Sequence, residues 1–164
     1  MARVTKNIEI ENAHIFFKNF SGSPTTFKPE GGARNFCVEI PDPNMAQRLR
    51  DDGWNVRVLA PKEEGDTPLN YLRVNVKFGE RLSPHILTIA NGTQTVLDES
   101  DVGNLDTADI KNVDLIIRPY NWEVGAGSGV SAYLKAMYVT IELDRFALKY
   151  AKMESPEDDL PFDI

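Results

Sequence analysis

Apolar and polar residues alternate along much of this chain, and that alternation limits the folds open to it. In the clearest case the two faces of one expected strand hold Leu72, Val74, Val76 and Phe78 on one side and Tyr71, Arg73, Asn75 and Lys77 on the other. Side chains of a strand point to opposite sides at every second residue, so this pattern predicts a sheet with one buried face. Shorter alternations at residues 8–10, 36–40, 54–58 and 113–117 favour a mainly β fold.

Local signals indicate where the strands are interrupted. Asp42 suits an N-cap, Pro43 the first helical position, and Gly53 the end of one short helix. Asn91-Gly92 predicts a tight turn within a hairpin over residues 85–97. The glycine-rich residues 125–129 join two expected strands at 112–124 and 130–142, and their composition predicts a mobile loop that could close over a ligand. Helical spacing at residues 143–150 indicates a further short helix.

These elements fit a small Greek-key barrel of the OB type, with one short helix, an extra hairpin and a tail. A β-sandwich would give much the same order of elements. With 164 residues, the chain has room for one well-cored domain, which we expect to span residues 1–153. Residues 154–164 contain five carboxylates, no basic residue and two prolines, so they are expected to form a disordered acidic tail.

The net charge of −7 is unevenly distributed. Besides the tail, the segment from Asp98 to Asp114 holds six acidic residues against Lys111 alone. The rest of the chain has 17 basic and 14 acidic residues, a surplus of three positive charges. Because the field at a binding face matters more than the total charge, this distribution is compatible with a polyanionic partner. It is equally compatible with an ordinary solvated surface.

Aromatic and basic residues share the polar faces of several expected strands. Single-stranded nucleic acid needs flat rings on which unpaired bases stack and cations beside them for the phosphates. Core packing is the competing interpretation for each aromatic residue, and it is preferred for Trp54 and for the lone Cys37. The candidates for stacking and phosphate contact are Arg34, Arg57, Tyr71, Arg73, Lys77, Arg118, Tyr120, Trp122, Tyr133 and Lys135.

Catalytic motifs are not found. The chain has no G-x-x-x-x-G-K-S/T loop, no H-E-x-x-H and no G-x-S-x-G, so we expect neither an enzyme nor a cofactor. Both histidines are isolated, and one cysteine cannot form a cysteine-based metal cluster. Asp42, Asp51 and Asp52 keep a metal site of the nuclease kind open. No segment approaches the roughly 20 apolar residues of a membrane span and no signal sequence is recognisable, so a cytoplasmic location is expected.

The end of the chain resembles a known family. Asp158-Asp159-Leu160-Pro161-Phe162 is similar to the acidic tip of single-stranded DNA-binding proteins, whose bacterial members end in aspartates followed by Ile-Pro-Phe. The body resembles the phage branch of OB-fold members in its length, its Trp122 strand and the segment 129–135. The resemblance implies that the tip recruits other proteins and competes with DNA for the binding groove. The implied partner-binding residues are Asp158, Asp159, Leu160, Pro161, Phe162 and Ile164.

One departure from the family concerns the last two residues. Asp163 and Ile164 follow Phe162, which therefore lacks the terminal carboxylate of the bacterial tip. Either the partner's pocket differs or Ile164 is the anchoring residue.

The sequence thus predicts a sequence-tolerant, phage-encoded single-stranded DNA-binding protein that coats DNA during replication or recombination in the host cytoplasm. Its expected partners are single-stranded DNA and, through the tail, replication or recombination proteins. Two other classes stay open, a phage structural or assembly protein of β-sandwich fold and a metal-dependent nuclease. The sequence also leaves open whether the unit is a monomer or a homodimer and whether it prefers DNA over RNA.

Overall fold

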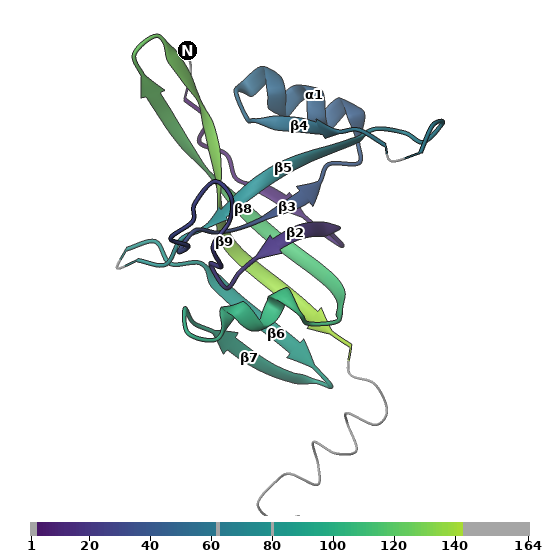
Figure 1. The fold of residues 1–164 in the computed structure, drawn as a ribbon, viewed down its shortest axis with the longest axis vertical. Helices are drawn as coiled ribbons and strands as arrows, with labels where there is room; N and C mark the ends of the chain where they lie inside the picture. The colour runs from purple at the N-terminus through teal and green to yellow at the C-terminus, as the bar shows by residue number, and fades with distance from the viewer. Residues whose placement is uncertain (1–2, 62, 80, 143–164) are drawn as a thin grey trace, which may run out of the picture.

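A computed structural model describes residues 3–61, 63–79 and 81–142, and the statements below concern those residues (Figure 1). The strands are β1 (Ile8–Ile10), β2 (Ile15–Asn19), β3 (Arg34–Glu39), β4 (Val56–Leu59), β5 (Leu69–Val76), β6 (His85–Ala90), β7 (Thr93–Leu97), β8 (Ile110–Val124) and β9 (Gly127–Ile141). The helices are α1 (Pro43–Asp52) and the short 3-10 helix η1 (Val102–Asp106). The predicted mainly β fold with a short α-helix is confirmed. The predicted helix at 143–150 and the predicted tail lie outside the described residues.

All the strands belong to one mixed sheet. Its main path runs β1-β8-β9-β5-β3-β2, with β4 paired to β5 and the β6–β7 hairpin attached to β9. Within the described part of the chain, β1 and β2 share no ladder, so the sheet does not close into the expected barrel. β1 has only three residues, and the chain turns after it at Asn12, whose φ is 50°. The two ends of the path are consecutive in the sequence and are linked by residues 11–14.

β9 is the central strand of this sheet and pairs with three others. One of its edges pairs with β8 along nearly its whole length. Its other edge pairs in parallel first with β5, at Ala132 and Tyr133, and then with β6, from Ala136 to Thr140. The described residues of the loop 77–84 therefore leave the sheet where β5 ends and return where β6 begins. This places the loop beside the middle of β9.

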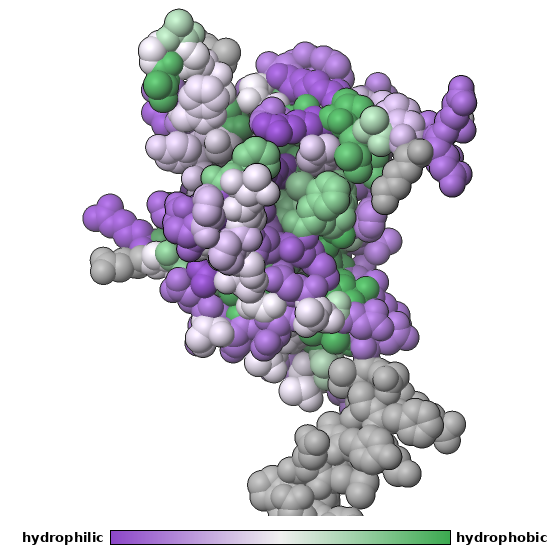
Figure 2. Space-filling view, in the orientation of Figure 1, coloured by the Kyte–Doolittle hydropathy of each residue, from purple (hydrophilic) through white to green (hydrophobic). Residues whose placement is uncertain are grey.

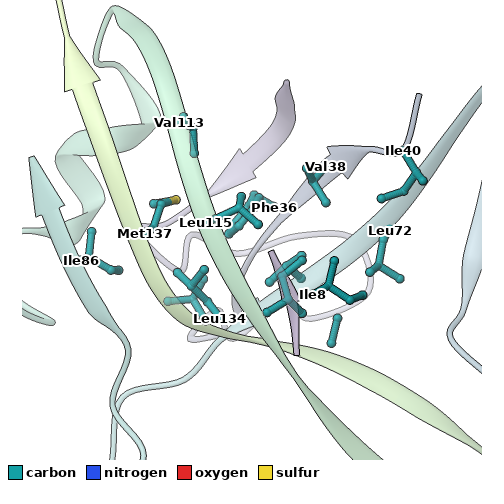
Figure 3. Close-up of a cluster of buried hydrophobic side chains, with 14 of the residues drawn as sticks. Ile8, Phe36, Val38, Ile40, Leu72, Ile86, Val113, Leu115, Leu134 and Met137 are labelled. Atoms are coloured by element: carbon teal, nitrogen blue, oxygen red, sulfur yellow. The ribbon is translucent and has the colours of Figure 1, made fainter. Parts of the chain in front are cut away.

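The inner face of the sheet holds the hydrophobic core. Side chains from β3, β5, β8 and β9 converge there, as the cluster in Figure 3 shows for Phe36, Leu72, Leu115, Leu134 and Met137. In β5 the predicted division is confirmed, because Leu72, Val74 and Val76 are buried and the alternate residues are exposed or half-buried. Trp54 and Cys37 are buried as predicted.

The predicted helix and turn are confirmed in detail. The Asp42 carboxylate accepts a hydrogen bond from the Asn44 amide (2.9 Å), and Gly53 ends α1 with a φ of 105°. Asn91 and Gly92 form the two-residue turn between β6 and β7, with φ of 50° and 79°. Positive φ at both central residues is the geometry that matches the twist of a hairpin. No helix of the described residues has the length and apolarity needed to cross a membrane.

The prediction of a mobile loop at 125–129 is wrong. Val124 pairs with Gly127, so a two-residue turn joins β8 and β9, and Gly127 to Gly129 belong to the strand. The Trp122 ring lies over Gly129, where an added Cβ would meet its Cζ2 at 2.8 Å. Glycine is needed there to leave room for the indole rather than to provide flexibility. The resulting hairpin end, residues 120–131, is called the arm below and projects beyond the body of the sheet (Figure 1).

Candidate nucleic-acid interface

One row of side chains crosses five strands on the face of the sheet opposite the core. Strand pairing aligns Arg118 of β8 with Tyr133 of β9, Tyr133 with Asn75 of β5, Asn75 with Asn35 of β3, and Asn35 with Asn19 of β2. Directly paired residues point to the same side of a sheet. The row therefore lies on one continuous surface, called the outer face below.

The first hollow lies at the β8–β9 end of this row. It has a volume of about 550 Å³ and is lined by Lys77, Gly79, Arg81, Leu82, Arg118, Tyr120 and Tyr133. The Arg118 guanidinium carbon lies 4.9 Å from the centre of the Tyr133 ring, and the Tyr120 ring meets that ring edge-on at 5.8 Å. Cation–π and edge-to-face contacts hold these groups in place without covering them, because Tyr120 remains 54% exposed.

The second hollow lies at the β2–β3 end. It has a volume of about 360 Å³ and is lined by Phe17, Asn19, Thr25, Thr26, Phe27, Asn35, Cys37, Arg57, Tyr71 and Arg73. Tyr71 contacts Phe16 edge-on, with ring centres 5.6 Å apart. Burial raises the pKa of the Cys37 thiol, and the guanidinium groups of Arg73 and Arg57 partly oppose that shift. Two cations therefore act on the floor of this hollow.

β5 connects the two hollows. Arg73 lines the second, Lys77 lines the first, and Asn75 lies between them on the same face. Four residues of a strand span about 13 Å. Together the hollows contain seven of the ten residues proposed from the sequence, namely Arg57, Tyr71, Arg73, Lys77, Arg118, Tyr120 and Tyr133. Figure 2 shows one side of the molecule, on which apolar side chains gather in patches between strongly polar ones.

The charge of the two hollows differs from that of the whole chain. Arg57, Arg73, Lys77, Arg81 and Arg118 line them, and none of the carboxylates among the described residues does. The acidic segment from Asp98 to Asp114 lies elsewhere, with Asp106 holding the Phe20 and Ser21 amides at 2.6 and 3.1 Å. The lining of the two hollows, as far as the described residues form it, is thus positive in a chain whose net charge is −7.

The other three candidate residues lie outside both hollows. Arg34 is in phase with the buried Phe36, and it donates to the Phe20 carbonyl (3.0 Å) and pairs with Glu99 (3.2 Å). Trp122 lies on the arm, in a separate hollow that also contains Arg3 and Asp52. Lys135 is exposed at an irregularity of β9, where Leu134 and Ala136 pair with consecutive residues of β8.

Among the lining residues that sequence reasoning missed are Phe17, Phe27, Arg81 and Leu82. Phe17 is turned outward by an irregularity in β2 that the sequence does not signal. Phe27 could have been noticed as an aromatic residue in an otherwise polar, proline-bounded loop. Arg81 and Leu82 belong to the loop 77–84, whose position depends on the parallel pairing of β5 and β6 with β9.

The carboxylates considered for a metal site do not lie together. Asp42 caps the start of α1, and Asp51, near its end, accepts a hydrogen bond from Gln47 (2.9 Å). A ten-residue helix is about 15 Å long, so these two carboxylates cannot share one ion. The described residues contain no group of three metal-ligating side chains.

Exposed aromatic rings beside cations on an open sheet face are the features that binding of single-stranded nucleic acid requires, and the described residues include no helix placed for reading a duplex. Comparison with known proteins identifies the family. Residues 1–163 match the family model described as "Putative phage ssDNA-binding domain". The chain belongs to this family of phage single-stranded DNA-binding proteins. No curated protein sequence matches it.

Solved structures support the same fold. The single-stranded DNA-binding protein of bacteriophage Enc34 in complex with ssDNA matches with a TM-score of 0.54 at 12% identity, covering 85% of this chain and 89% of that one. Another structure of the Enc34 protein gives 0.51 at 13% identity, covering 85% and 83%. The single-stranded DNA-binding protein gp2.5 of bacteriophage T7 aligns over 98% and 96% at 11% identity, but its TM-score of 0.42 is too low to establish a common fold.

Proposed function

We propose that the protein binds single-stranded DNA across the outer face of β5 and coats it without strong sequence preference. The observation that carries this proposal is the composition of the two hollows, which combine five cations with the rings of Phe17, Phe27, Tyr71, Tyr120 and Tyr133. Every base has a face that can stack, so rings beside cations bind unpaired strands of any sequence.

The candidate residues take different roles in this proposal. Tyr71, Tyr120 and Tyr133 stack on bases. Arg57, Arg73, Lys77 and Arg118 contact phosphates. Trp122 extends the surface along the arm because it is in phase with Arg118 and Tyr120 on β8, and Lys135 makes a peripheral phosphate contact. Arg34 has a structural role, since the Phe20 carbonyl and Glu99 already hold its guanidinium.

The tail is assigned a second role. Asp158, Asp159, Leu160, Pro161, Phe162 and Ile164 recruit replication or recombination proteins in the host cytoplasm, and without DNA the carboxylates compete for the cations of the outer face. Deleting residues 154–164 should tighten DNA binding at low salt, because charge interactions at an exposed surface are screened as salt rises. Unchanged affinity at low salt would exclude the competition but not the recruitment.

Titration with oligo-dT tests the proposed DNA binding. Fluorescence of Trp122 and the tyrosines is followed at two salt concentrations, with and without magnesium. Salt-sensitive quenching with an intact oligonucleotide supports coating. No quenching and no change in anisotropy of a labelled oligonucleotide would favour a structural role, and magnesium-dependent cleavage would favour a nuclease.

A further inference from the structure

Two phenylalanines in the second hollow are exposed to an extent that core packing does not explain. The Phe27 side chain is 96% exposed and that of Phe17 is 64% exposed. Phe17 contacts Phe16 edge-on at 4.9 Å, whereas Phe27 makes no ring contact with any other described aromatic residue. Both line the same hollow, so an open apolar surface lies beside the cations there.

Phe17 is held outward at a conformational cost. Its φ is 49°, a left-handed conformation that is unfavourable for a bulky residue, and the register of β2 shifts between Phe16 and Asn19. Without this irregularity, alternation would give Phe17 a different orientation. Such strain persists only where the surrounding structure enforces it, and it is common at ligand sites.

The loop that carries Phe27 is held at both its base and its tip. At the base, the Gly32 amide donates to the Gly22 carbonyl (2.7 Å), and Asn19 accepts from the Ser23 amide (2.9 Å). At the tip, the Thr25 amide donates to the Lys28 carbonyl (3.0 Å), and the Thr25 hydroxyl accepts from the Lys28 amide (3.0 Å). The exposure of Phe27 is therefore built into a hydrogen-bonded loop.

We propose that Phe17 and Phe27 form a separate base-binding subsite, in which an unpaired base lies against these two rings while Arg57 and Arg73 bind the adjoining phosphates. This inference rests on the proposed function and adds a subsite to it. The occupant is a nucleotide rather than an apolar peptide segment because the same hollow supplies two cations and no described carboxylate. Stacking provides the apolar contact and the guanidinium groups the charge contact.

The test compares Phe17→Ala and Phe27→Ala with Tyr138→Ala as a matched control. Tyr138 is also an exposed ring on the sheet, at 37%, but lines neither hollow. Each phenylalanine variant should bind a long oligo-dT about fivefold more weakly, since one stacking contact is reduced. The control should bind like the unaltered protein. Thermal unfolding should be unchanged in Phe27→Ala, because that side chain is almost fully exposed.

A second readout identifies the contact directly. An oligo-dT with single 5-iodouracil substitutions is irradiated on the protein, and the crosslinked peptides are identified by mass spectrometry. Crosslinks at Phe17 or Phe27 support the subsite. If the unaltered protein binds oligo-dT but both variants bind equally well and crosslinks fall only in the first hollow, the subsite is refuted and the proposed function stands. If the unaltered protein does not bind oligo-dT, the proposed function itself fails.

Discussion

The two hollows of the outer face are built differently. In the first, Arg118 of β8 and Tyr133 of β9 are directly paired, and the Arg118 guanidinium packs over the Tyr133 ring. In the second, only one side is regular strand, and the other is formed by the irregular end of β2 and the loop that carries Phe27. The Tyr133 ring of the first hollow is therefore fixed in advance by its neighbours, whereas the Phe27 ring of the second hollow contacts no other described aromatic ring.

This difference affects how much each hollow contributes to the free energy of DNA binding. A preorganised ring loses little conformational freedom when a base stacks on it, so most of the stacking free energy contributes to affinity. Phe27 must be immobilised at that moment, which offsets part of its stacking contribution. We therefore expect the first hollow to dominate affinity and the second to extend the length of strand that is bound.

The largest expected effect tests that ranking. Tyr133→Ala should weaken binding of oligo-dT about thirtyfold, near 2 kcal/mol, because the ring that holds both Arg118 and Tyr120 is lost. Phe27→Ala should cost about fivefold, near 1 kcal/mol. Equilibrium titrations of both variants under one buffer condition provide the comparison. Equal losses, or a larger loss for Phe27→Ala, would reverse the proposed ranking.

Salt dependence tests whether one strand crosses both hollows. Each of Arg118→Gln, Lys77→Gln, Arg57→Gln and Arg73→Gln should reduce the slope of log affinity against log salt by about 0.7. Arg34→Gln is the matched control and should leave the slope unchanged, because Glu99 and the Phe20 carbonyl occupy its guanidinium. A reduced slope for Arg118 and Lys77 alone would confine the DNA to the first hollow.

In both hollows the residues on regular strands were predictable from the sequence, whereas those that depend on a register shift or on a loop were not. Alternation identified Tyr71, Arg73 and Lys77 as one face of a strand, because the period of a strand is a local property. The outward turn of Phe17 depends on a register shift against β3, and the hollow around Lys77 depends on the parallel pairing of β5 with β9. These are long-range properties that no local pattern encodes.

Glycines illustrate the same limit. The composition of residues 125–129 predicted mobility, since glycine both loosens loops and fits where a side chain cannot. Only the pairing of Trp122 with Gly129 distinguishes these two roles, because it brings the indole over the glycine. Local patterns likewise could not predict that the sheet stays open. Closing it into a barrel would require β1 to continue far enough to pair with β2, and β1 has only three residues.

Stability should couple to the second hollow more than to the first. The Asp106 carboxylate binds the Phe20 and Ser21 amides at the start of the loop that carries Phe27. Asp106→Ala should lower the free energy of unfolding by about 1 kcal/mol, because two backbone donors lose their acceptor. Denaturant unfolding measures this, with the exposed Asp109→Ala as control. Equal stability of the two variants would show that Asp106 does not stabilise the start of the loop that carries Phe27.

The smallest expected effect concerns the reactivity of Cys37. Burial raises the pKa of its thiol, so at pH 8 less thiolate is present than in the unfolded chain and alkylation should be slow. DNA phosphates on Arg57 and Arg73 would weaken the cations that lower this pKa, so bound oligo-dT should slow alkylation further. The rate is measured by mass spectrometry with and without oligo-dT. A rate that DNA leaves unchanged would place the strand away from the second hollow.

The most direct test of the outer face as the DNA-binding surface is an NMR titration of the isotope-labelled protein with oligo-dT. The row from Arg118 through Tyr133, Asn75 and Asn35 to Asn19 should show the largest chemical-shift changes, with little change in β7. Changes concentrated in β7 or α1, with the row unaffected, would contradict the proposed binding surface.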